Sequence, residues 1–170
     1  NLVLRLLGMK AEAEEENLTE EELRMMIELG KEKGAIDEDE TEWIQNVFDF
    51  RDTSILSSMT READIISLDE HSTDQEIISI IRESGLSRLP VYTKDREDIR
   101  GVLYTREYLL NLTAPQPKSL DQLLHDAYFV PESIHADDLF RDMQTKKVHM
   151  AIVVDEYGNL SGLITLEDLL

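Results

Sequence analysis

The chain has 170 residues, and its 41% of hydrophobic residues suffice for the core of one compact unit or of two small repeats packed together. Seventeen basic against 37 acidic residues give a net charge of −20, which argues against a nucleic-acid binder and against docking on an anionic membrane. The absence of cysteine excludes disulfides and thiolate metal sites. The acid excess is typical of a solvated, repelling surface; the alternative is a role for cations such as Mg²⁺ shared with a bound phosphate.

A membrane span is not visible, because no apolar run reaches the roughly 20 residues that cross a bilayer and no signal peptide occurs. The chain begins at Asn1 without methionine, with the short apolar stretch Asn1–Met9, and it stops at Leu170 within an expected helix. We therefore expect a fragment of a longer protein, with any membrane segment outside the sequence.

Residues 1–52 predict a helical linker. Two capping sequences, Thr19 with Glu22 and Asp37 with Glu40, each open a helix. The apolar residues expected to point inward are Leu23, Met26, Ile27 and Gly30 in the first helix and Ile44, Val47 and Phe48 in the second.

Residues 53–113 alternate short strands with helices. The expected elements are a strand at Ile65–Leu68, a helix opened by Ser72 with Gln75 and closed by Gly85, strands at Arg88–Thr93 and Ile99–Leu103, and a helix at Thr105–Leu112. A proline-containing linker follows at residues 113–118.

The same plan recurs in residues 114–170. Adding 62 to a position carries Leu89 to Ala151 and the strand at Ile65–Leu68 to 127–130, while Gly101 and Gly162 differ by 61. One βαββα unit exposes a sheet face that it cannot bury alone, so two units should pack together. The predicted fold is α+β, with a helical linker followed by two βαββα repeats stacked through their sheets.

A strand runs into a helix near the end of the second repeat, at Gly162-Leu-Ile-Thr165-Leu-Glu-Asp168. A hydroxyl at the helix start lies beside free backbone N–H groups, where an anionic phosphate is held. A carboxylate three residues later lies on the same face and can accept both hydroxyls of a ribose. This spacing fits a nucleotide site; the alternative is that Thr165 is only an N-cap and Asp168 only favours the positive helix end.

With this motif and the repeat around it, the chain resembles the pair of CBS domains, or Bateman module, of the CorC/HlyC hemolysin-like family, related to the CNNM magnesium transporters. The resemblance covers nearly the whole chain. The segments that carry it are Asn1–Gly8, Thr19–Arg24, Glu42–Phe50, Met59-Thr60, Asp64-Ile65, Ser87–Tyr92 and Gly162–Asp168. The first of these is similar to the link from a transmembrane domain.

The resemblance implies that one of two clefts between the repeats binds an adenine nucleotide, ATP or AMP, with or without Mg²⁺. Leucines would wall the adenine, Asp168 would bind ribose, and Thr165 and Arg88 would hold phosphate. The implied ligand residues are Thr60, Leu86, Ser87, Arg88, Leu89, Pro90, Leu163, Thr165 and Asp168.

The chain departs from the family pattern at three places. Arg61-Glu62 replaces Pro-Arg, and Leu86 stands where an aromatic residue or histidine often precedes Ser-Arg. In the first repeat Tyr104 and Glu107 occupy the positions of Thr165 and Asp168. Because Tyr104 is bulky, we expect it to pack in the second cleft and to leave no room for a ligand there.

No catalytic constellation is visible, and we expect no enzyme. The four histidines are scattered without partners at metal-ligand spacing, and no P-loop, Gly-x-Ser-x-Gly elbow or His-Glu-x-x-His motif occurs. His149 matches Ser87 under the repeat offset, so it either lines the second cleft or packs.

By resemblance, the chain is a regulatory module at the cytoplasmic face of the cell membrane that gates a transporter of divalent cations, Mg²⁺ or Co²⁺. The implied partners are the nucleotide, a transmembrane domain outside this sequence, and a second copy in a homodimer. Two alternatives remain open: a ligand-free structural dimerisation module, and a sensor of S-adenosylmethionine, whose positive charge would not need Arg88.

Overall fold

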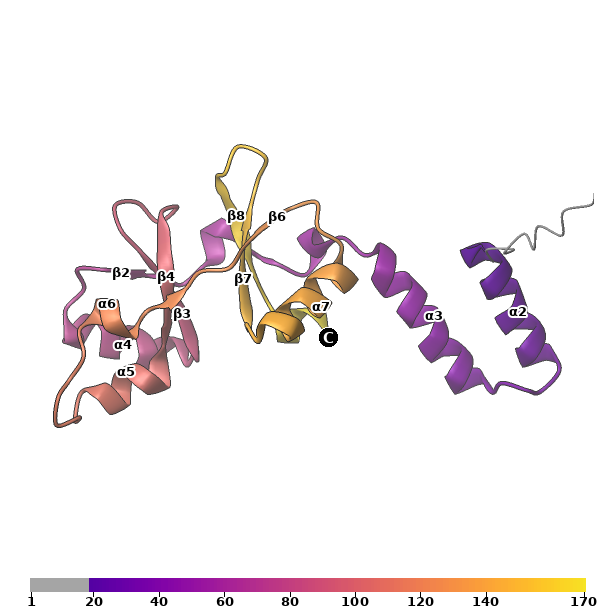
Figure 1. Cartoon of the computed structure of the whole chain (residues 1–170), viewed down its shortest axis with the longest axis horizontal. Helices are drawn as coiled ribbons and strands as arrows, with labels where there is room; N and C mark the ends of the chain where they lie inside the picture. Colours follow the sequence, from indigo (N-terminus) through magenta and orange to yellow (C-terminus); the bar gives the residue numbers. More distant parts are fainter. Residues whose placement is uncertain (1–18) are drawn as a thin grey trace, which may run out of the picture. The chain divides into compact units, whose positions relative to one another are not determined.

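The computed structural model describes residues 19–170, and Asn1–Met9 lies outside them (Figure 1). The chain divides into two compact units, one ending at Phe48 and one running from Asp49 to Leu170. None of the described helices is both long and apolar enough to cross a membrane.

The first unit contains α2 (Glu20–Glu32) and the larger part of α3 (Glu38–Asp52). Both predicted capping sequences are confirmed, since Thr19 and Glu22 exchange side-chain and backbone hydrogen bonds, as do the residues that open α3. The predicted inward faces are only partly correct. Phe48 is buried with the Arg24 guanidinium 5.0 Å above its ring, but α2 has no buried residue and Val47 is 63% exposed.

The second unit contains two four-stranded sheets and the helices that cover them. The first repeat provides β1 (Thr60–Arg61), β2 (Leu68–Asp69), α4 (Asp74–Ser84), β3 (Arg88–Tyr92), β4 (Ile99–Tyr104) and α5 (Thr105–Asn111). The second provides α6 (Leu120–Leu123), β5 (His125–Asp126), β6 (Phe129–Pro131), α7 (Ala136–Lys146), β7 (Met150–Val154), β8 (Leu160–Thr165) and α8 (Leu166–Leu169). Two 3₁₀ helices, η1 (Ile55–Ser57) and η2 (Glu62–Asp64), lie near the start of the unit.

Each repeat lends one strand to the sheet of the other. The strand orders are β1-β8-β7-β6 and β2-β3-β4-β5, so β1 leaves its own repeat to pair with β8, and β5 crosses to pair with β4. A Cβ at Gly162 would collide with the carbonyl oxygen of Thr60, and one at Gly101 would lie 2.8 Å from that of His125. The two glycines that mark the repeat therefore allow the crossing strands to approach closely.

The predicted strands at 65–68 and 127–130 are displaced in the structure, where β2 begins at Leu68 and β6 spans Phe129–Pro131. Residues 65–67 and 127–128, which the prediction included, belong to neither a helix nor a strand. The helix α4 also begins one residue later than predicted, because Thr73 and Glu76 form the capping box instead of Ser72 and Gln75. Gly85 ends α4 in the left-handed conformation, φ 64°, as predicted.

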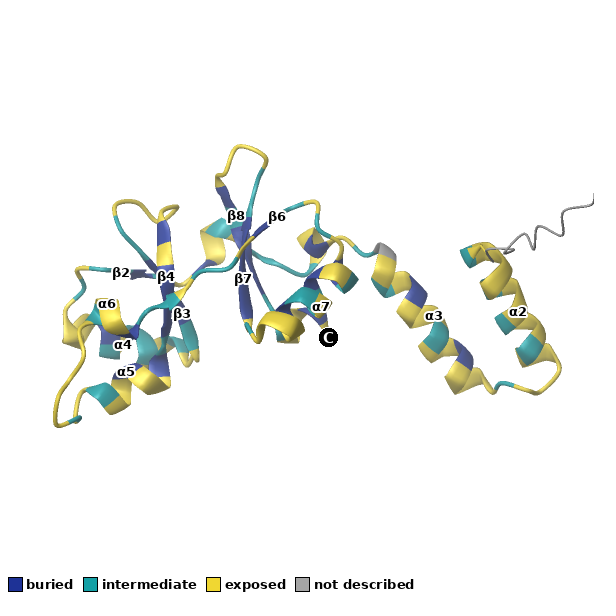
Figure 2. Ribbon diagram, in the orientation of Figure 1, coloured by how far each residue is buried: buried dark blue, intermediate teal, exposed yellow. Residues whose placement is uncertain are grey.

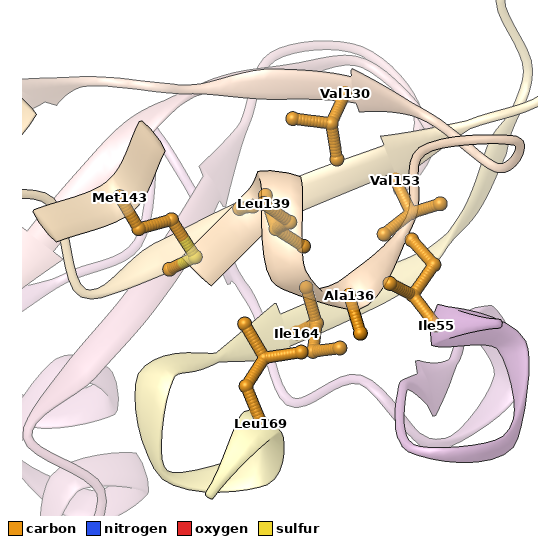
Figure 3. Close-up of a cluster of buried hydrophobic side chains, with 9 residues drawn as sticks. Ile55, Val130, Ala136, Leu139, Met143, Val153, Ile164 and Leu169 are labelled. Atoms are coloured by element: carbon orange, nitrogen blue, oxygen red, sulfur yellow. The ribbon is translucent and has the colours of Figure 1, made fainter. Parts of the chain in front are cut away.

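The core consists of three clusters of buried hydrophobic side chains. Figure 2 shows that many of the buried residues lie on the central strands. The two sheets face each other through residues of both repeats, among them Val102 and Leu163. The outer face of one sheet packs on α4 and α5, and that of the other packs on α7 and α8, where Leu139, Met143 and Ile164 are completely buried (Figure 3). This arrangement confirms the prediction of two βαββα repeats stacked through their sheets.

Candidate functional site

A cleft of about 370 Å³ opens between the two repeats, at the edge where the crossing strand β1 pairs with β8. Its walls combine apolar side chains with polar groups that come from both repeats. The lining residues are Thr60, Asp64, Ile65, Ile66, Leu86, Arg88, Pro90, Met150, Leu163, Thr165 and Asp168.

The structure brings together all of the expected site residues except Ser87 and Leu89. The pairing of Thr60 with Leu163 across β1 and β8 joins the start of the first repeat to the end of the second. The alternation of β3 points Arg88 and Pro90 into the cleft and directs Leu89 to the opposite face of the sheet.

Leu89 and Ser87 do not line the cleft. Leu89 is completely buried in a cluster that includes Ile77 of α4, Tyr108 of α5 and Leu123 of α6. The carbonyl oxygen of Ser87 accepts hydrogen bonds from the backbone N–H of Thr105 at 3.0 Å and from its hydroxyl at 3.2 Å. These bonds hold the start of β3, and thus Arg88, against the start of α5.

Four lining residues were missing from the sequence prediction: Asp64, Ile65, Ile66 and Met150. Asp64 ends η2, and Ile65 and Ile66 follow it before β2, where the sequence predicts a strand. Met150 begins β7 and is equivalent to Arg88 under the offset of 62, so the repeat itself was the available signal. Ile66 is 45% exposed and Leu86 is 42% exposed, leaving two apolar surfaces accessible at the cleft.

Thr165 and Asp168 form a reciprocal capping box at the start of α8. The Thr165 hydroxyl oxygen accepts the backbone N–H of Asp168 at 3.3 Å, and Oδ2 of Asp168 accepts the backbone N–H of Thr165 at 2.9 Å. The capping role that the sequence left open is therefore present. The box also orients the two side chains, and it leaves the hydroxyl proton of Thr165 and Oδ1 of Asp168 for other partners.

Arg88 is the cation of the cleft, and its environment fits an anionic ligand. Its Nε is fully buried and has no hydrogen-bond partner, and among residues 19–170 the guanidinium pairs with no carboxylate. The guanidinium carbon instead lies 5.2 Å from the centre of the Tyr104 ring. A buried donor without a partner is uncommon, because it bears the desolvation penalty without a compensating bond.

The equivalent positions of the second cleft are occupied by stacked side chains. Tyr104, which replaces Thr165 in the first repeat, makes no side-chain cap to α5 and stacks on His125 with ring centres 3.8 Å apart and an interplanar angle of 12°. His125 Nε2 lies 2.8 Å from Oε2 of Glu107, the residue equivalent to Asp168. His149 is exposed, and its carbonyl oxygen accepts the N–H of Leu166.

A protein-held metal centre is not found in the described part of the chain, where no three histidine or acidic side chains are grouped to hold an ion.

Comparison with protein families places residues 53–113 and 121–170 in the CBS domain family. The chain is 34% identical over 151 residues to the magnesium and cobalt efflux protein CorC of Escherichia coli, a match that covers 88% of this chain. It spans about half of the length of that relative, 52%.

Solved structures of CBS domains are also similar to this chain. The CBS domain of the bacterial CNNM/CorC family Mg²⁺ transporter is 34% identical, with a TM-score of 0.80 over 89% of this chain and 93% of that one. Its complex with ATP matches 77% of this chain and 94% of that one, at the same identity and a TM-score of 0.70. A CBS-domain pair of Klebsiella pneumoniae with bound AMP is 26% identical, with a TM-score of 0.62 over 69% of this chain and 94% of that one.

Proposed function

Because the chain belongs to the CBS domain family, as a pair of the CNNM/CorC type, we propose that it is a regulatory module that binds an adenine nucleotide between its repeats. The family is not a class of enzymes. The observation that carries the proposal is the cleft itself, which combines apolar walls with a hydroxyl, a carboxylate and a cation whose buried donor lacks a partner.

The division of the cleft suits the parts of an adenine nucleotide. The apolar side chains at its entrance, Ile66 and Leu86, offer accessible surface to a base. Asp168 accepts hydrogen bonds from the ribose hydroxyls through Oδ1, while the Thr165 hydroxyl donates to a phosphate oxygen. Arg88 supplies the charge-assisted bond to the phosphate.

The ligand is ATP or AMP, and Mg²⁺ accompanies the polyphosphate. A ligand with several negative charges approaches a chain of net charge −20 that also places Asp64 and Asp168 at the cleft. A phosphate-bound Mg²⁺ reduces this repulsion. The support from relatives is the ATP complex of the CNNM/CorC domain and the AMP complex of the Klebsiella pair.

The whole protein, of which this chain is a part, transports divalent cations such as Mg²⁺ or Co²⁺, with the module at the cytoplasmic face of the membrane. Bound nucleotide favours one closed geometry of the two repeats, and the helices before residue 53 pass this preference to the transmembrane domain. The support is the relation to CorC and to the CNNM/CorC transporter.

The test is thermal unfolding with ATP, ADP or AMP, each with and without Mg²⁺. A nucleotide at 100 times its dissociation constant adds about 2.7 kcal/mol of stability to the wild-type chain. Asp168→Ala loses this gain, while Glu167→Ala, an exposed acid on the same helix turn, retains it. No stabilisation of the wild type by any of the nucleotides would exclude the sensor.

The second candidate is a ligand-free dimerisation module, favoured by exposed leucines on α5. Leu109 and Leu110 are 43% and 63% exposed, and an apolar surface of this kind suits contact with a second copy of the chain. The homodimer is compatible with both candidates. Sedimentation together with the unfolding experiment separates them, because only the sensor gains stability from nucleotide.

A further inference from the structure

Arg88 is oriented in the cleft by an aromatic ring and not by a carboxylate. Arg88 and Tyr104 lie directly opposite each other in the paired strands β3 and β4, with the guanidinium carbon 5.2 Å from the ring centre. This separation is within the range of a cation–π contact, about 6 Å. The contact fixes the position of the charge without using any of the guanidinium N–H donors, and the buried Nε is one that has no partner.

The ring of Tyr104 is itself held in place from the other side of β4. His125 reaches it from β5, the strand that crosses over from the second repeat, and the two rings are nearly parallel. Glu107 on α5 lies 2.8 Å from the imidazole and fixes its orientation. A residue of the second repeat thus supports the ring on which a cation of the nucleotide cleft rests.

A carboxylate in the place of Tyr104 would have a different effect on the cleft. It would neutralise Arg88 and occupy its donors, so that a phosphate would have to compete for them. An aromatic ring attracts the cation through its quadrupole and leaves the donors to the ligand. This difference matters because the chain has 37 acidic residues. Their carboxylates compete with a phosphate for the guanidinium of an arginine.

We propose that Tyr104 is a positioning residue of the nucleotide cleft, whose ring, supported by His125 and Glu107, holds Arg88 ready for the phosphate of the ligand. The inference rests on the proposed function. It gives Tyr104 a role in the open cleft in addition to its packing in the filled one. Tyr104 fills one cleft and at the same time organises the other.

The test measures the binding of Mg²⁺-ATP and of adenosine to the full chain by calorimetry. Tyr104→Leu removes the ring and weakens ATP binding by about two- to thirtyfold, the range that corresponds to a cation–π contact. Adenosine, which has no phosphate, binds as it does to the wild type. Tyr104→Phe keeps the ring and binds ATP normally, and the matched control Tyr157→Leu, at a side chain that is 83% exposed, has no effect.

A double-mutant cycle separates positioning from a general loss of structure. In an Arg88→Gln background, Tyr104→Leu causes no further loss of ATP affinity. An equal loss with and without Arg88, an equal loss for adenosine, or unchanged ATP binding by Tyr104→Leu would overturn the inference. If Tyr104→Leu does not fold, His125→Ala replaces it, since it removes the support and leaves the ring; unchanged ATP affinity would then overturn the inference.

Failure of this inference is distinct from failure of the proposed function. A wild-type chain that binds no ATP overturns both. A wild-type chain that binds ATP, loses binding with Asp168→Ala and is indifferent to Tyr104→Leu overturns only the role of Tyr104.

Discussion

The two clefts between the repeats are built from equivalent backbone positions and differ in their side chains. In both, the carbonyl oxygen of the residue before a central strand accepts a hydrogen bond from the N–H at the start of a helix. The N–H of Thr105 donates to Ser87 at 3.0 Å, and the N–H of Leu166 donates to His149 at 3.1 Å. In both, a strand of the partner repeat crosses over a glycine. The backbone alone therefore does not decide which cleft can take a ligand.

Side chains at two positions make the difference. The pair Thr165 and Asp168 forms a small reciprocal cap that leaves a cleft of about 370 Å³ beside it. The equivalent pair, Tyr104 and Glu107, gives up the side-chain cap and places an aromatic ring and a carboxylate against His125. Equivalent backbone positions thus leave one cleft open and fill the other with stacked side chains.

The largest effect is expected from disturbing the crossing strands on which both clefts depend. Gly162→Ala places a methyl group against the carbonyl oxygen of Thr60, which cannot move without displacing β1. Overpacking of this kind costs about 1–3 kcal/mol of unfolding free energy, measured by urea denaturation. It also weakens ATP binding, because β1 carries Thr60 into the open cleft.

Gly101→Ala is the matched variant on the filled cleft, where the new methyl group meets the carbonyl oxygen of His125. We expect a comparable loss of stability and a smaller loss of ATP affinity, since β5 contributes no residue to the lining of the open cleft. Equal losses of affinity in the two variants would show that β5, which does not line the open cleft, supports it as strongly as β1 does.

The sequence was sufficient for the parts of this comparison that depend on local patterns. The offset of about 62 residues predicted the two repeats, and the spacing of Thr165 and Asp168 predicted their shared position at the start of a helix. The swap of β1 and β5 could not be predicted, because two-residue strands have no periodicity and their partners are about 100 and 25 residues away.

The contacts of single side chains were also beyond the sequence. Asp64 lines the cleft because it lies at the end of the 3₁₀ helix η2. The apolar run Ile65-Ile66 predicts a strand and gives no sign of this helix. The sequence showed that Tyr104 was too large for a ligand position, but its contact with Arg88 depends on the register of β3 and β4. Register and ring stacking are tertiary properties that local propensity does not encode.

A gain of function would sharpen the contrast between an aliphatic open cleft and an aromatic filled one. Leu86 is 42% exposed at the cleft and provides surface but no stacking for a base. Leu86→Phe adds an aromatic face and strengthens ATP and adenosine binding alike, by about two- to tenfold, the range expected for an aromatic pair beyond its buried area. Calorimetry measures both ligands, with Leu110→Phe, at a side chain of α5 that is 63% exposed, as the control. Weaker binding of both would place the base elsewhere in the cleft.

Away from the clefts the two repeats are more alike, since each ties a tyrosine hydroxyl to an aspartate on a helix. Tyr108 donates to Asp74 and Tyr128 donates to Asp142. Burial, together with the hydrogen bond to Asp142 and its negative charge, raises the pKa of Tyr128 to about 12 from an ordinary value of 10.0. The folded state therefore holds this proton more tightly than the unfolded state.

The smallest expected effect is the dependence of stability on pH that follows from this tyrosine. Because its pKa is raised on folding, the contribution of Tyr128 is fully present below pH 10.0 and is lost as the pH rises toward about 12. Tyr128→Phe lowers the unfolding free energy by about 0.5 kcal/mol at pH 8, the low end for a hydrogen bond because the side chain is partly exposed. Urea denaturation at pH 8 and pH 11 then shows a smaller decline in unfolding free energy for the variant than for the wild type.

The control is Tyr157→Phe, at a side chain that is 83% exposed, and its unfolding free energy declines in parallel with that of the wild type. The contribution of Tyr108 cancels, because the wild type and both variants contain this residue. Parallel declines of Tyr128→Phe and the wild type would show that Asp142 does not hold the tyrosine proton, and the likeness of the two repeats would then be limited to their backbones.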